Sequence, residues 1–260
     1  MKQNKIMLFF FITLPVSLVL RFLQLCFTIE SNTGFFINET KNFGPILLLM
    51  ILLTALSVAV FSWLTFIRPN NPPKTTVFMS VSALALSLSI FAELVFKNTV
   101  VAISWQDTLL KLLSLAVIAY FVLFALSRFI KIELPEIASS VTVLYIIIRM
   151  ICDFTSISKL ALISDNILLI FTYCALLTFF LNFTKLTCHA DNDKSFKAIL
   201  SSGLASVVLC FTSSIPNLLV NLILKNGYHH SSLLTCVTLL LLGVFILSYI
   251  LSYFSKDNIK

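Results

Sequence analysis

Apolar residues fall into eight long runs along the chain, and short polar segments separate the runs. Each run is long enough to cross about 30 Å of hydrocarbon as a helix that rises about 1.5 Å per residue. The pattern therefore predicts an all-α, polytopic membrane protein with eight transmembrane helices. We place these helices at residues 6–27, 44–67, 76–96, 107–130, 137–158, 164–184, 196–222 and 231–254.

The composition agrees with this pattern and excludes a water-soluble globular protein. Of the 260 residues, 59% are hydrophobic and only 11% are charged, against roughly 25% charged residues in soluble domains. The net charge of +7 is spread over the short loops and is not gathered on a soluble domain. We therefore expect the lipid bilayer as a partner and no binding of nucleic acid.

The positive residues outside the predicted helices are distributed unevenly between the two sides of the membrane. The two termini and the loops on their side hold most of them, whereas the opposite loops hold only Lys41, Lys97, Lys159 and Lys225. Lys and Arg are enriched in cytoplasmic loops of membrane proteins. The sequence thus predicts a multi-pass protein of the plasma membrane with both termini in the cytoplasm.

A weak internal similarity relates the two halves of the chain. Ser-Ala-Leu-Ala from Ser82 corresponds to Ser-Gly-Leu-Ala from Ser202, and Leu and Phe positions of the fourth predicted helix recur in the eighth. This pattern predicts a tandem duplication of a four-helix unit in parallel topology, with repeats at 1–131 and 132–260. The alternative is chance, because Leu, Phe and Ser are very frequent in this chain.

Polar and charged side chains inside the predicted helices are the candidate functional residues. A charge in mid-helix costs about 2.5–3.5 kcal/mol on insertion scales, so it needs a partner or a water-filled path. The arginines and the glutamate lie toward the same side of the membrane. The candidate substrate-binding residues are Arg21, Gln24, Glu93, Arg149, Asp153, Asn217 and Asn221.

Sequence spacing predicts how some of these residues are arranged. Gln24 follows Arg21 by three residues and Asp153 follows Arg149 by four, so each pair shares one helix face. We expect Arg149 to be buried between helices near Asp153, and the seventh helix to break at Pro216 and line a cavity. Alternatively, the arginines extend to lipid headgroups and the carboxylates only neutralise them.

Two functions from different classes fit this pattern. The first is a transporter or permease-like subunit for a small anionic or zwitterionic solute. The second is a non-catalytic receptor or scaffold subunit that binds a membrane protein partner through small-residue helix faces. No catalytic, phosphate-binding or metal-binding motif is found, so we expect no enzymatic activity, cofactor or metal. A lipid-acting enzyme with Glu93 and Asp153 as an acid/base pair stays open.

Overall fold

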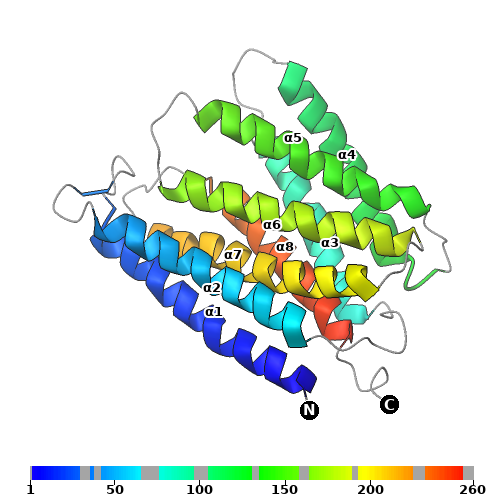
Figure 1. Ribbon diagram of the computed structural model, residues 1–260. Coiled ribbons are helices and arrows are strands. Elements are labelled where there is room, and N and C mark those ends of the chain that lie inside the picture. Colours follow the sequence, from blue (N-terminus) through cyan, green and yellow to red (C-terminus); the bar gives the residue numbers. More distant parts are fainter. Residues whose placement is uncertain are drawn as a thin grey trace.

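The protein is all-helical in a computed structural model, which describes most of the chain between Lys2 and Tyr253 (Figure 1). The described residues are 2–29, 36–37, 42–65, 76–96, 105–130, 135–157, 164–188, 193–224 and 232–253. Eight α-helices lie in these ranges. They are α1 (Lys2–Phe27), α2 (Phe43–Thr65), α3 (Val77–Phe96), α4 (Trp105–Leu126), α5 (Ser140–Ile157), α6 (Ser164–Thr187), α7 (Asp193–Leu224) and α8 (Leu233–Tyr253), and a 3-10 turn, η2 (Glu136–Ser139), precedes α5.

Seven of these helices are long and apolar enough to cross a membrane, so the chain is a multi-pass membrane protein. Among the described residues α5, which carries both Arg149 and Asp153, does not belong to this set, so seven of the eight predicted transmembrane helices are found. All eight helices lie where the apolar runs predict them, with ends that differ by up to about four residues. The prediction of orientation used four loop lysines that lie outside the described residues, Lys41, Lys97, Lys159 and Lys225.

The helices form a bundle with α7 near its centre. Helix α7 packs against α1, α2, α6 and α8, and most of it is buried. The pair α1–α2 lies along one edge of the bundle, and α4 and α5 lie on the opposite side (Figure 1). Helix α6 contacts both α5 and α7, and so connects the two sides.

Helix α7 continues through Pro216, so the predicted break at this residue is wrong. Proline removes the backbone N–H that would bind the carbonyl of Thr212, yet the surrounding helices and nearby hydroxyl groups allow a membrane helix to continue. The hydroxyl groups of Ser213 and Ser214 both donate to the carbonyl of Cys210, at 3.1 and 2.6 Å.

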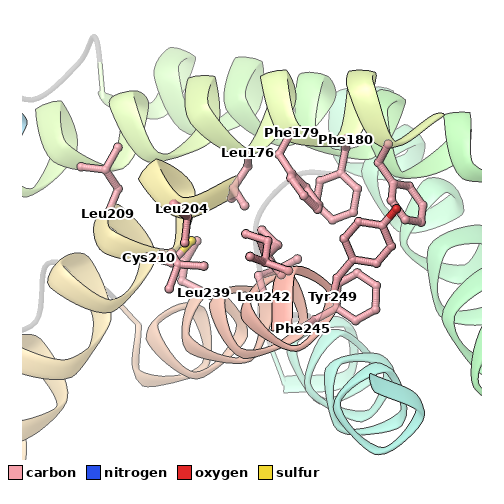
Figure 2. Close-up of a cluster of buried hydrophobic side chains, with 14 of the residues drawn as sticks. Leu176, Phe179, Phe180, Leu204, Leu209, Cys210, Leu239, Leu242, Phe245 and Tyr249 are labelled. Atoms are coloured by element: carbon pink, nitrogen blue, oxygen red, sulfur yellow. The ribbon is translucent and has the colours of Figure 1, made fainter. Parts of the chain in front are cut away.

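An aromatic core fills the half of the bundle near the start of α1 and the end of α8. Figure 2 shows rings of this core from α6 and α8, among them Phe179, Phe180, Phe245 and Tyr249. The ring centroids of Phe183 and Tyr249 are 5.0 Å apart, and those of Phe121 on α4 and Phe245 are 5.2 Å apart. Gly203 on α7 allows the close approach of these helices. A Cβ atom at this position would lie 2.7 Å from Ile250 and 3.0 Å from Phe179.

The first four helices pack as two separate pairs. Helices α1 and α2 pack against each other and on α7, whereas α3 and α4 pack against each other and on α8 and α5, respectively. Both pairs thus depend on helices of the second half for much of their packing. The duplication into residues 1–131 and 132–260 stays a prediction.

Candidate functional site

The buried charged side chains gather in two clusters near one end of the bundle, where α1 ends and α6 begins. We name them by their arginines. The Arg149 cluster consists of Glu93, Tyr145, Arg149, Asp153, Tyr173, Thr235 and Thr238, and the Arg21 cluster consists of Arg21, Gln24 and Asp165.

The centre of the Arg149 cluster is an ion pair between α5 and α3. Arg149, which is 5% exposed, donates from both terminal nitrogens to the carboxylate of Glu93, with Nη1 2.8 Å from Oε2. Two parallel hydrogen bonds fix both the distance and the plane of the groups, so this is a strong and directional contact. The predicted burial of Arg149 between helices is confirmed.

Hydroxyl groups of nearby tyrosines and threonines also form hydrogen bonds with this ion pair. Arg149 donates to Tyr145 at 2.6 Å and, through Nε, to Tyr173 at 2.9 Å. The carboxylate of Glu93 also accepts hydrogen bonds from Thr235 at 3.0 Å and Thr238 at 3.3 Å, both on α8. The Thr238 hydroxyl shares its one hydrogen between Glu93 and the carbonyl of Leu234, which is 2.9 Å away. Both oxygens of Glu93 thus accept hydrogen bonds from Arg149 and from a threonine of α8.

Asp153 lies at the periphery of this cluster. One of its oxygens is 3.9 Å from Nε of Arg149 and accepts a hydrogen bond from Tyr173 at 2.8 Å. Its side chain is 22% exposed, against 7% for Glu93. The expected pairing along the helix is therefore present, but Glu93 on another helix is the principal partner of Arg149.

The Arg21 cluster joins α1, α2 and α6. Arg21 is fully buried and forms an ion pair with Asp165 in the first turn of α6. It also donates to the side-chain oxygen of Gln24, as the three-residue spacing predicts, and Gln24 in turn donates to the carbonyl of Gly44 at 2.9 Å. Asp165 lies in the first turn of α6, where the helix dipole favours an acidic side chain.

The two asparagines of α7 differ in their surroundings. Asn217 is 3% exposed, and its Nδ2 donates to the carbonyl of Ser213 one turn earlier on the same helix, at 2.9 Å. Its Oδ1 is buried and has no hydrogen-bond partner within the described part of the chain. Asn221 is half-buried one turn further along.

Comparison of the chain with protein-family models, with curated proteins and with solved structures finds no match. Within the described residues, no group of three or more His, Cys, Asp or Glu side chains is placed to hold a metal ion.

Sequence reasoning missed Asp165 and the hydroxyl-bearing partners of the Arg149 cluster. Asp165 stands at the start of a predicted helix, where an acidic residue is common on helix-dipole grounds alone, so it gave no sign of a buried partner. Tyr145 precedes Arg149 by four residues, and this spacing alone would have placed it on the same face. The contributions of Tyr173, Thr235 and Thr238 come from other helices and have no local signal.

Proposed function

We propose that the protein is a transporter or permease-like subunit for a small anionic or zwitterionic solute. The observation that carries this proposal is the complete burial of Arg21 within a membrane bundle, where it pairs with a carboxylate from another helix. A buried guanidinium is costly in a membrane and is kept mainly where it serves a pathway or a ligand. The carboxylate or phosphate of a solute can replace the protein carboxylate at such a site.

The ion pairs between helices also provide a means to couple binding to movement. Arg21 joins α1 to α6 and Arg149 joins α5 to α3. If a solute takes the place of Asp165 or Glu93, the link between two helices is released. This is the kind of differential contact that a change between two conformations of a transporter requires.

Uptake into liposomes tests the proposal. The purified protein, reconstituted in liposomes, should take up at least one member of a radiolabelled panel of acetate, phosphate, sulfate, glycine and alanine faster than protein-free liposomes do. Uptake should be lost in Arg21→Ala, because the countercharge for the solute is removed. A folded protein that takes up none of these solutes would overturn the proposal.

A second candidate function is a non-catalytic receptor or scaffold subunit of a larger membrane complex. The observation in its favour is the hydrogen bonding of Glu93 and Arg149, whose polar groups pair with one another and with neighbouring hydroxyls. Such a cluster stabilises the bundle without any ligand. Co-purification of a membrane protein partner from native membranes, together with absence of uptake, would favour this function.

We also propose that the protein lies in the plasma membrane with both termini in the cytoplasm, as the distribution of Lys and Arg predicts. Single cysteines introduced at Asn42 and Asn192, in a variant without native cysteines, should be labelled by an impermeant reagent from opposite sides, with Asn42 outside. Labelling of both sites from one side, or of Asn192 from outside, would contradict this orientation.

The predicted duplication belongs to the same proposal, because two related bundles with a site between them are a common architecture of transporters. It predicts that residues 1–131 superpose on residues 132–260 in the same topology, with Arg21 near Arg149 after rotation. A superposition that pairs other helices, or that requires inversion, would contradict it.

A further inference from the structure

Helices α1 and α7 run in the same direction, and two contacts fix their relative height. The hydroxyl of Thr212 on α7 donates to that of Ser17 on α1 at 3.1 Å, and the two residues are 195 positions apart in the sequence. Leu25 and Val220, separated by the same number of positions, belong to one buried apolar cluster. Arg21, midway between Ser17 and Leu25, is therefore level with Pro216 and Asn217.

Helices α6 and α7 run in opposite directions, and a contact between them shows that Asp165 lies at the same height along the bundle as Asn217. Gly203 on α7 approaches Phe179 on α6 so closely that a Cβ atom on the glycine would lie 3.0 Å from the ring. Asp165 precedes Phe179 by the same number of residues by which Asn217 follows Gly203. All helices rise about 1.5 Å per residue, so Asp165 and Asn217 are also level.

The ion pair of Arg21 with Asp165 and the two registers thus place three buried polar side chains at one height on three helices. The side-chain amide of Asn217 is oriented by its bond to Ser213, which uses Nδ2 and leaves Oδ1 as a buried acceptor without a donor among the described residues. Buried acceptors in native proteins are nearly always satisfied, so each exception calls for a bound group or a function.

From this arrangement we infer that Arg21, Asp165 and Asn217 form a binding site for a small zwitterion that carries an ammonium and a carboxylate on neighbouring atoms, as an α-amino acid does. The inference rests on the proposed transport function and names its site and substrate class. Arg21 would bind the carboxylate of the solute. Asp165 and Oδ1 of Asn217 would accept from its ammonium.

The charges of the three side chains select a zwitterion over a simple anion. The arginine and the aspartate together are neutral, and Asn217 adds a neutral acceptor. A solute carboxylate alone would displace Asp165 from Arg21 and leave a buried carboxylate without a cation, which is costly. A zwitterion supplies both a partner for Arg21 and a partner for Asp165, and it also provides the N–H donor that Asn217 lacks.

The apolar surroundings are consistent with an occluded site. The cluster of Leu25, Ile29, Val220 and Phe36 lies next to these residues, toward the end of α1 and α7. Arg21 is 0%, Asn217 3% and Asp165 8% exposed. Because water is excluded, an ammonium and a carboxylate bound here would interact strongly with the protein groups.

The test compares three matched probes on the full-length protein in detergent and in liposomes. Alanine has both groups, propionate lacks the ammonium and ethylamine lacks the carboxylate. We expect alanine alone to raise the Tm by several degrees at saturation, because it binds only the folded state. Alanine uptake should saturate and should not be reduced by equal concentrations of propionate or ethylamine.

Two variants assign the effect to the site. Asn217→Leu and Asp165→Asn should each weaken alanine binding at least tenfold. Asn182→Leu is the matched control, because Asn182 on α6 also donates from Nδ2 to a carbonyl one turn earlier, at 2.7 Å, but lies near the other end of the helix. It should bind alanine as the wild-type protein does. If Asp165→Asn fails to fold, alanine binding by Asn217→Leu alone tests the proposed site.

Two results would overturn the inference and are distinguishable from failure of the proposed function. Uptake of phosphate, sulfate or acetate without any response to alanine would show a transporter whose substrate is an anion. Alanine uptake that Asn217→Leu leaves unchanged would place the site elsewhere. Absence of uptake of every solute by the folded protein would instead contradict transport itself.

Discussion

The surroundings of Arg149 and of Arg21 both contain buried polar side chains, but they differ in how many of the buried acceptors receive a hydrogen bond. Around Arg149, each oxygen of Glu93 accepts two hydrogen bonds, and two tyrosine hydroxyls take further N–H groups of the arginine. Near Arg21, by contrast, the buried Oδ1 of Asn217 accepts no hydrogen bond from the described residues. A saturated cluster gains little from a ligand, whereas an unsatisfied acceptor gains a bond when a donor binds.

The comparison teaches that a buried charge in a membrane helix is a poor guide to function until its partners are known. By sequence, Arg149 is the stronger candidate, because Asp153 stands one turn away. In the structure Arg149 and its partners Glu93, Tyr173, Thr235 and Thr238 hold α3, α5, α6 and α8 together by hydrogen bonds. Asn217, which lies level with Arg21, has a buried acceptor that no described residue satisfies.

The largest expected effect comes from breaking the ion pair of the Arg149 cluster. Arg149→Ala leaves the carboxylate of Glu93 buried without a cation, and should lower the free energy of unfolding by about 3–5 kcal/mol. The double variant with Glu93→Ala should restore much of this loss, whereas the double variant with Asp153→Ala should not. Thermal unfolding in detergent measures all three. Rescue by Asp153→Ala instead would make Asp153 the principal partner.

Removal of a single hydroxyl from the same cluster should have an intermediate effect. Tyr173→Phe deletes the group that accepts from Arg149 and donates to Asp153, and should cost about 1.5–3 kcal/mol, because both bonds involve charged partners. The neighbouring Thr172→Val is the control, since its hydroxyl donates to a carbonyl of its own helix, at 2.7 Å. Equal losses in the two variants would show that the cluster adds nothing beyond ordinary hydrogen bonds.

Neutral hydrogen bonds between helices outside the clusters should matter less. Ser82→Ala removes the contact between the hydroxyls of Ser82 on α3 and Ser248 on α8, which are 3.1 Å apart. Such bonds contribute about 0.6 kcal/mol on average in a membrane protein. The same unfolding assay should therefore show a shift in Tm of roughly 1–2 °C. A loss of stability as large as that of Tyr173→Phe would contradict the larger contribution expected from the charged cluster.

Asn217→Leu should change the free energy of unfolding least, unlike a substitution in the Arg149 cluster. In the absence of solute, Asn217→Leu should leave the free energy of unfolding within about 1 kcal/mol of wild type or raise it, because it removes an unsatisfied buried acceptor. Thr235→Val, of similar burial in the saturated cluster, should instead lower it by about 1.5–3 kcal/mol. A large loss of stability in Asn217→Leu would mean that its Oδ1 has a partner essential to the fold.

The positions of the helices, and the polar residues that share one helix face, can be predicted from the amino-acid sequence. The apolar runs locate all eight helices to within about four residues, and seven of these helices are long and apolar enough to span a membrane, whose thickness sets their length. Spacings of three and four residues correctly paired Gln24 with Arg21 and Asp153 with Arg149, because the geometry of one helix fixes these contacts.

In contrast, the packing of the helices sets which helix faces are buried and which distant residues are in contact. On α2, Leu48 is 7% exposed and Leu49 is 59% exposed, although both are leucines. Lipid and the core of the bundle are equally apolar, so the pattern of hydrophobic residues does not show which face of the helix is buried. The pairs Arg149–Glu93 and Arg21–Asp165 depend on the rotation and relative height of separate helices. The packing of the helices sets both the rotation and the relative height, and no local sequence pattern predicts either.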